Sequence, residues 1–189
     1  MEALLTSTVI VALAEMGDKT QLLAIVLATR FRKPLPIIAG IFVATVGNHF
    51  LAALLGSQAA AFLDGAWFRY LVALSFIAMA IWTLVPDKFD ETGDKPDLFG
   101  AFLTTLIAFF LVEMGDKTQI ATIALGARFH EVVAVTIGTT LGMMIANVPA
   151  IFLGSELVKR VPLKIVRLIA ASLFLVIGIW LLVQTAGLV

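Results

Sequence analysis

The seven residues Glu-Met-Gly-Asp-Lys-Thr-Gln occur twice in the chain, at 15–21 and at 113–119, and each copy lies inside a long apolar stretch. A charged side chain at the middle of a membrane span costs about 3 kcal/mol on insertion scales, so these groups are expected to face an interior or a water-filled cavity. Carboxylate and amide oxygens are ligands for hard divalent cations such as magnesium, calcium and manganese. The two copies therefore predict a metal site made of Glu15, Asp18, Gln21, Glu113, Asp116 and Gln119.

The spacing within each copy indicates how these side chains would be arranged on a helix. On a helix, Glu15, Asp18 and Gln21 are spaced three residues apart, so they share one face, and the second copy repeats this arrangement. Lys19 follows Glu15 by four residues, which is a favourable spacing for an ion pair, and Lys117 repeats it in the second copy. The lysines are expected to hold the carboxylates in place, or to occupy the site when the ion is absent.

Two further residue types in the motif have supporting roles. Gly17 and Gly115 lower helix propensity just before each aspartate, which allows a kink, a broken helix or a close helix contact. Thr20 and Thr118 follow each Asp-Lys pair, and their hydroxyls can either bind the ion or bond back to their own helix.

The charges of the two copies predict an exchange reaction. Four carboxylates and two lysines leave two net negative charges, which one divalent cation or two protons would neutralise. This balance favours antiport of one cation against about two protons. Two alternatives remain open, namely Glu–Lys pairs that only link helices and a proton relay without metal.

Weaker candidates lie in the second and fifth apolar stretches. Asn48 and His49 are adjacent, and Asn147 lies 98 residues after His49. As a ligand, His49 would favour a transition metal over calcium, although a buried histidine is more often a hydrogen-bonded core residue.

The composition is that of a polytopic membrane protein. Of 189 residues, 61% are hydrophobic and 14% are charged, and the mean hydropathy is +1.06, whereas soluble domains carry roughly 25% charged residues. The net charge of zero indicates no nucleic-acid partner. The chain has no cysteine, which excludes thiol catalysis and zinc-thiolate sites. It also lacks His-Glu-x-x-His and Gly-x-Ser-x-Gly motifs, so neither an enzyme nor a bound cofactor is expected.

Six apolar stretches are long enough to be membrane-spanning helices of about 20 residues. They fall near 3–29, 35–61, 67–85, 98–126, 131–155 and 162–186. The predicted fold is therefore all-α, with six transmembrane helices arranged as two inverted-topology three-helix repeats.

The repeat has a constant offset of 98 residues. At this offset Gly40 meets Gly138 and Trp82 meets Trp180, without a gap across three spans. The expected division is a first repeat at 1–87, a cytoplasmic linker at 88–97 and a second repeat at 98–189. Because each repeat has an odd number of spans, the second enters the membrane from the opposite side.

The distribution of Lys and Arg predicts the orientation. Nine lie beside the loops after the first, third and fifth spans, whereas only Arg69 and Arg128 lie at the other ends. Since positive charge favours the cytoplasmic side, both termini are expected outside the cytoplasm, in a multi-pass protein of the cell (inner) membrane.

Two copies of Glu-x-Gly-Asp-Lys-Thr in a six-span chain resemble the Gly-Asp-Lys-Thr family of divalent cation/proton exchangers. This family includes bacterial manganese exporters and eukaryotic Golgi manganese/calcium transporters, and the resemblance covers nearly the whole chain. It implies that Glu15, Asp18, Glu113 and Asp116 are the family's acidic motif residues. The polar residues that follow them carry over as Lys19, Thr20, Gln21, Lys117, Thr118 and Gln119.

For a compact bacterial-like chain, the resemblance implies manganese export from the cytoplasm by cation/proton antiport with alternating access. The expected partners are the metal ion, protons and the lipid bilayer. Two alternatives remain: a calcium/proton exchanger of the same fold, and an exporter of small molecules of the amino-acid type. The latter would need a roomier cavity with fewer acids.

Overall fold

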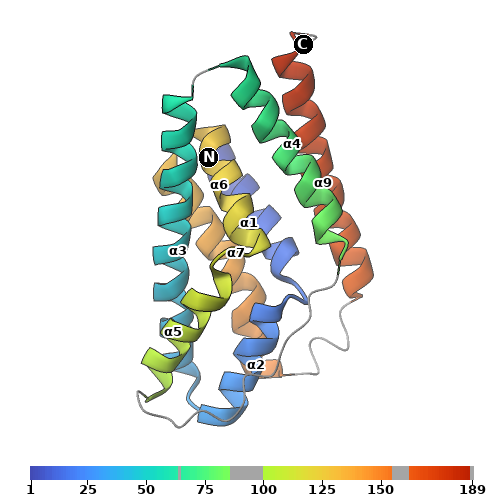
Figure 1. Ribbon diagram of the computed structural model, residues 1–189. Helices are drawn as coiled ribbons and strands as arrows, with labels where there is room; N and C mark the ends of the chain where they lie inside the picture. The colour runs from blue at the N-terminus through green and yellow to red at the C-terminus, as the bar shows by residue number, and fades with distance from the viewer. Residues whose placement is uncertain (64, 86–99, 155–161, 188–189) are drawn as a thin grey trace.

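The computed structural model describes residues 1–63, 65–85, 100–154 and 162–187, and all the regular structure in these ranges is helical (Figure 1). The helices are α1 (Glu2–Glu15), α2 (Lys19–Phe31), α3 (Pro34–Phe62), α4 (Ala66–Thr83), α5 (Gly100–Glu113), α6 (Lys117–Phe129), α7 (Val132–Leu153) and α9 (Leu163–Thr185). The all-α prediction is confirmed for this part of the chain. The linker expected at 88–97 lies outside the described residues.

Four helices are long and apolar enough to cross a membrane, namely α3, α4, α7 and α9, with 29, 18, 22 and 23 residues. The helices α1, α2, α5 and α6 have only 14, 13, 14 and 13 residues, which is less than the roughly 20 that one span requires. The prediction that Glu15, Asp18 and Gln21 share one helix face is therefore wrong, as is its counterpart in the second copy, because both stretches consist of two shorter helices.

A glycine breaks each of these stretches. Gly17 has a φ of +78° and Gly115 a φ of +76°, a left-handed conformation that glycine adopts without steric penalty. The Gln21 Oε1 atom accepts a hydrogen bond from the Gly17 backbone N–H at 3.0 Å, and Gln119 Oε1 accepts one from Gly115 at 2.7 Å. Of the three outcomes that the glycines allowed, the broken helix is the one that forms, and in each copy a glutamine side chain braces the break.

The first helix of each half packs against the first long helix of the other half. Thus α1 lies along α7, and α5 lies along α3. A Cβ atom at Gly138 would lie 2.5 Å from the Leu4 carbonyl oxygen, and one at Gly40 would lie 2.7 Å from the Phe102 carbonyl oxygen. Both glycines and both carbonyls are related by the 98-residue offset, so the sequence repeat is also a repeat of helix contacts.

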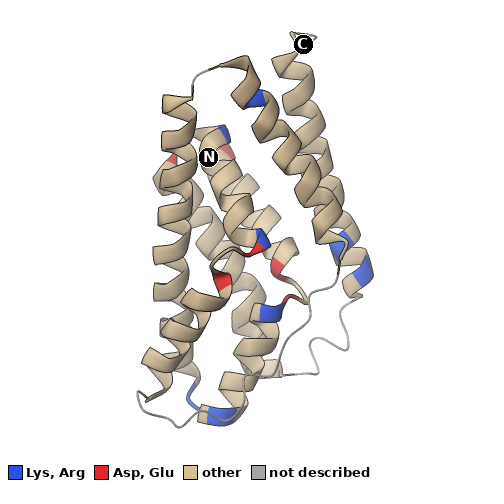
Figure 2. Cartoon of the chain, in the orientation of Figure 1, with Lys and Arg blue, Asp and Glu red and all other residues tan. Residues whose placement is uncertain are grey.

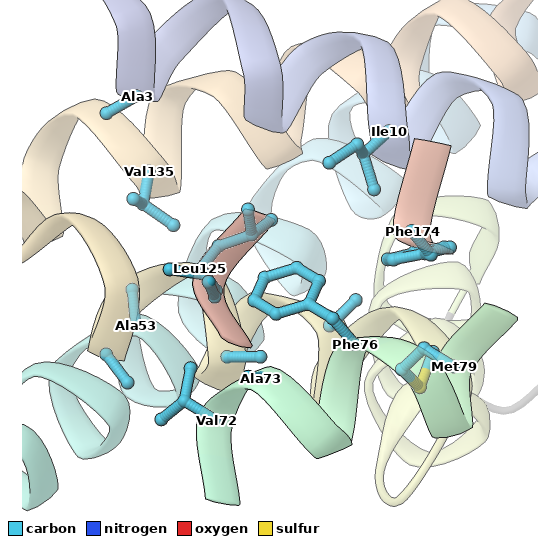
Figure 3. Close-up of a cluster of buried hydrophobic side chains, with 14 of the residues drawn as sticks. Ala3, Ile10, Ala53, Val72, Ala73, Phe76, Met79, Leu125, Val135 and Phe174 are labelled. Carbon is cyan, nitrogen blue, oxygen red and sulfur yellow. The ribbon is translucent and has the colours of Figure 1, made fainter. Parts of the chain in front are cut away.

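The helices α4 and α9 form a third pair related by the same offset. Phe76 and Phe174 are both fully buried, and their ring centroids are 6.2 Å apart. Around them, α4 and α9 pack on α1 and α6 through a core that includes Ile10 and Leu125 (Figure 3). Within the described ranges, α4 and α9 have no comparable packing against α2 and α5.

The surface of the bundle is largely apolar, as a lipid-facing surface must be. Large hydrophobic side chains such as Leu55, Leu74, Ile145 and Ile169 point outward from the four long helices. Figure 2 shows that charged residues gather instead at the ends of the bundle and around the two helix breaks in its middle. The breaks are therefore the polar interior of this fold.

Candidate metal centre

The four acidic motif residues occupy the ends of the short helices. Glu15 is the last residue of α1 and Glu113 the last residue of α5, while Asp18 and Asp116 are the N-cap residues of α2 and α6. Their exposed fractions are 0%, 1%, 5% and 3% in the same order. The breaks thus place four carboxylates inside the bundle, where burial of isolated charges is unfavourable unless a cation or a hydrogen-bond donor accompanies them.

Three of these carboxylates form a compact group with contributions from both halves. One oxygen atom from each of Glu15, Asp18 and Asp116 lies within 4.8 Å of the others. Metal–oxygen bonds of about 2.0–2.6 Å separate ligands across an ion by about 4–5 Å. The group therefore fits one hard divalent cation, and Glu113 lies outside it.

The helix ends add their own electrostatic field at this position. The C-terminal ends of α1 and α5 carry partial negative charge and attract cations, whereas the N-terminal ends of α2 and α6 carry partial positive charge. Neither Asp18 nor Asp116 uses its side chain to cap its helix. Their carboxylates are therefore directed to other partners, as in the discontinuous helices of transporters whose ends coordinate ions.

The lysines do not make the contacts that the sequence spacing predicted. Lys19 Nζ lies 3.0 Å from Asp116 Oδ1, so it pairs across the two halves rather than with Glu15. Lys117 Nζ donates to the Val85 carbonyl oxygen at 2.9 Å and lies 5.9 Å from the centroid of the Trp82 ring. The predicted pairing of each lysine with the glutamate four residues earlier is wrong, because that geometry requires an unbroken helix.

Two threonine hydroxyls hold Glu15. Thr20 donates to Glu15 Oε2 and Thr118 donates to Glu15 Oε1. Thr118 belongs to the second heptapeptide, so this carboxylate is fixed by donors from both halves. Instead of bonding back to their own helices, both hydroxyls orient a candidate ligand.

Glu113 has different neighbours, which come from α3. Thr45 Oγ1 donates to Glu113 Oε1 at 3.3 Å, and His49 Nε2 lies 3.8 Å from Glu113 Oε2. Neither ring nitrogen of His49 has a hydrogen-bond partner among the described residues. Sequence reasoning missed Thr45, although its position one helical turn before His49 is a signal that could have found it.

The amide side chains mainly support the breaks. Gln21 Nε2 donates to the Ala146 carbonyl oxygen at 2.9 Å, and Gln119 Nε2 donates to Asn48 Oδ1 at 3.2 Å. Asn48 in turn donates to the Phe110 carbonyl oxygen at 3.0 Å. Both glutamine oxygens already accept one hydrogen bond from a glycine, so the structure places Gln21 and Gln119 beside the carboxylates and gives them a bracing role.

Asn147 lies fully buried on α7. Its Nδ2 atom donates to the Met143 carbonyl oxygen at 3.1 Å and lies 2.8 Å from Met143 Sδ. Its Oδ1 atom has no partner among the described residues. Asn147 and His49 are thus related by the 98-residue offset and lie on equivalent helices. They differ in chemistry, because one has an amide side chain and the other an imidazole.

Sequence reasoning also missed a contact between α9 and the helix break at Gly17. A guanidinium nitrogen of Arg167 on α9 donates to the Gly17 carbonyl oxygen at 3.4 Å. A Cβ at Gly17 would lie 2.6 Å from the Leu163 side chain, whereas a Cβ at Gly115 would have nothing within 4 Å. Among the described residues, α9 therefore covers the first break, and no residue covers the second break at its glycine.

The chain matches a family model over residues 3–91 and 101–188, and the description of that family is "Divalent cation/proton antiporter GDT1". The chain belongs to this family, which confirms the resemblance inferred from the doubled motif. Membership makes it a multi-pass membrane protein of a transporter family for divalent cations, and this family is not a class of enzymes.

Curated relatives cover nearly the full chain. It is 47% identical over 180 residues to a Vibrio cholerae protein named "Putative manganese exporter", with 95% of this chain and 90% of that protein aligned. It is 28% identical to GDT1-like protein 5 of Arabidopsis thaliana, covering 88% of this chain and 89% of that one. A GDT1-like protein of Synechocystis sp. is 27% identical, with coverages of 92% and 93%. No solved structure matches the chain.

Proposed function

We propose that this protein exports manganese by exchanging one Mn²⁺ for about two protons through alternating access. The observation that carries the proposal is the group formed by Glu15, Asp18 and Asp116, because it joins carboxylates of both heptapeptides around one point in the bundle. Gln21, Gln119 and Glu113 complete the surroundings of the ion. Lys19 holds Asp116 until the ion arrives.

The choice of manganese rests on the donor atoms and on a relative. Carboxylate oxygens accept manganese, calcium and magnesium, whereas a nearby imidazole favours manganese over calcium. His49 Nε2 lies 3.8 Å from Oε2 of Glu113, the fourth acidic residue of the two motifs. The Vibrio cholerae relative at 47% identity has manganese export in its name. A calcium/proton exchange by the same site is the alternative.

Proton exchange follows from charge balance in an apolar setting. The four acidic residues and two lysines of the motif leave two net negative charges. Emptying the site without replacing the cation would leave that charge buried, which is strongly unfavourable. Binding of about two protons removes the penalty and permits the return step of the cycle.

The proposed architecture is six spans in two inverted repeats, with α1–α2 and α5–α6 each acting as one span. Repeat-related contacts at Gly40 and Gly138 and the Phe76–Phe174 pair support a pseudo-two-fold axis through the metal centre. Both termini lie toward the same end of the bundle (Figure 1), as an even number of crossings requires. We place that end outside the cytoplasm, because the opposite end carries most of the positive charge.

Alternating access would use the difference between the two breaks. In the described state α4 and α9 pack on α1 and α6, and Arg167 and Leu163 of α9 cover Gly17. The repeat predicts a second state in which α4 and α9 pack instead on α5 and α2. A rocking motion of the α4–α9 pair would then expose the ion to one side at a time.

Flux in proteoliposomes tests the proposal. The purified protein would be reconstituted with an internal pH-sensitive dye and exposed to manganese, calcium and magnesium in turn. We expect manganese-driven proton movement that is lost in Asp116→Asn and retained in Glu131→Gln, an acid-to-amide change at an exposed position outside the site. Metal uptake without a proton signal would contradict antiport. Equal activity of Asp116→Asn and wild type would contradict the site and favour a small-molecule substrate.

A further inference from the structure

A cavity lies away from the carboxylates, at the end of the bundle where both termini lie. Its volume is about 450 Å³, which is within the range of small-ligand pockets. The end of α3, the start of α4 and the ends of α6 and α9 enclose it. Its polar lining consists of Arg69, Arg128, His130, Gln184 and Thr185, and no Asp or Glu among the described residues lines it.

The arginines of this cavity are unusual for their location. Arg69 and Arg128 are the only Lys or Arg residues that the sequence predicts at this end of the spans, and the structure places both at the same cavity. The Arg128 guanidinium lies 5.6 Å from the centroid of the Phe129 ring. Stacking on a ring leaves the in-plane N–H groups of a guanidinium available for an anion. Two cationic side chains therefore line this cavity.

Aromatic residues next to the cavity lining in the sequence indicate the level of the bilayer surface. Phe62, Trp67 and Tyr70 each adjoin a lining residue along the chain and are 83%, 57% and 37% exposed. Exposed Trp and Tyr are enriched at the level of lipid headgroups. The inner wall is apolar, with Phe68 and Leu181 among its residues, so it can accommodate hydrocarbon beside the charged groups.

We propose that this cavity binds the phosphate headgroup of an anionic phospholipid. Arg69 and Arg128 contact the phosphate, Gln184 and Thr185 provide further hydrogen-bonding groups, and an acyl chain lies along Phe68 and Leu181. The cavity does not suit the transported ion, because two guanidinium groups repel a divalent cation. The lipid site is independent of the metal centre, and each can be tested without the other.

The repeat-related residues have other contacts. Arg30, equivalent to Arg128, lies 5.6 Å from the centroid of the Phe31 ring, and Arg167, equivalent to Arg69, donates to the Gly17 carbonyl oxygen. Neither of them lines this cavity. The pairing of two arginines around a pocket is thus specific to this end and is not a simple consequence of duplication.

Native mass spectrometry of the detergent-purified full chain tests the proposal. Wild type would be compared with Arg69→Gln/Arg128→Gln and with Lys33→Gln/Lys164→Gln, which removes two exposed charges elsewhere. Each protein would be titrated with phosphatidylglycerol, with phosphatidylcholine and with inorganic phosphate alone. Thermal unfolding in phosphatidylcholine would verify that each variant is folded.

We expect wild type and the lysine variant to retain phosphatidylglycerol equally. The arginine variant should bind it at least about tenfold more weakly, because charge-assisted hydrogen bonds to phosphate are among the strongest. Unchanged phosphatidylglycerol binding in the arginine variant would overturn the proposal. Equal loss in the lysine variant would overturn it too, since non-specific attraction would then explain the binding. Arginine-dependent binding of inorganic phosphate without the lipid would show a free anion to be the ligand and overturn the lipid assignment.

Discussion

The two heptapeptides are identical in sequence and nearly identical in backbone, yet they form unequal halves of one site. Each has a left-handed glycine, an aspartate N-cap and a glutamine that accepts a hydrogen bond from that glycine. These features depend only on the seven residues themselves. The local sequence is therefore sufficient to break the helix in the same way twice.

The two copies differ in the contacts that their glutamates make, and Glu113 contacts residues outside the motif. Glu15 receives hydrogen bonds from Thr20 and Thr118 and belongs to the three-carboxylate group, whereas Glu113 contacts Thr45 and His49. Such inequality is expected when one of two alternating conformations is described, because the pseudo-symmetry then relates two states rather than two halves. It is also expected where the two repeats have diverged, as at His49 and Asn147.

The largest expected effect is a difference in manganese affinity between variants of Glu15 and of Glu113. Glu15→Gln should weaken manganese binding by about 100-fold, since removal of one charged partner from a buried cluster costs several kcal/mol. Glu113→Gln should weaken binding by about tenfold or less, because this carboxylate lies outside the group. Isothermal titration of the purified protein measures both. Equal losses of affinity would mean that the two glutamates contribute alike to manganese binding, although their contacts differ.

Alanine substitutions at Gly17 and Gly115 would compare the two helix breaks by their effect on the free energy of unfolding. Gly115→Ala should lower the free energy of unfolding by about 1 kcal/mol, the strain of a left-handed alanine. Gly17→Ala should lower it by about 2 kcal/mol, because its Cβ also meets Leu163 at 2.6 Å. Thermal unfolding in detergent gives both values.

A double-mutant cycle provides the control for this pair. Leu163→Ala should relieve part of the defect of Gly17→Ala and leave that of Gly115→Ala unchanged. If Leu163→Ala coupled equally to both glycine variants, α9 would not be the element that distinguishes the two breaks.

The threonine contacts should give a smaller effect on affinity. Thr118→Val removes a hydroxyl that fixes Glu15 from the opposite half, so manganese affinity should fall by about tenfold, as is typical for groups that orient ligands. Thr45→Val removes the weaker contact to Glu113, at 3.3 Å, and should change affinity by less than about threefold. A greater loss for Thr45→Val in the same titration would reverse the assigned importance of the two glutamates.

The smallest effect is expected at His49. Changing His49→Asn gives α3 the residue that α7 carries at the equivalent position, and so it makes the two halves more alike. We expect transport to persist and the preference for manganese over calcium to fall by about threefold to tenfold, since imidazole favours the transition metal. Competitive flux of the two ions measures the ratio. An unchanged ratio would restrict His49 to a packing role.

Much of this site could be predicted from the sequence because its chemistry is concentrated in seven residues. Their type indicated a hard divalent cation, and Gly17 and Gly115 indicated where a helix could break. The prediction failed where it assumed an unbroken helix, since Lys19 pairs with Asp116 rather than with Glu15. Contacts such as Thr45 with Glu113 depend on how α3 packs against α5, and no local pattern determines that packing.

In the proposed exchange, one divalent cation replaces protons at the group of Glu15, Asp18 and Asp116. Calorimetric titration with manganese, in buffers of different ionisation enthalpy, counts the ions bound and the protons released. It would be performed over the pH range in which carboxylates and histidine titrate. We expect one ion per chain and a maximum of about two protons released, with both signals lost in Asp18→Asn. Binding without proton release, or unchanged binding in Asp18→Asn, would contradict it.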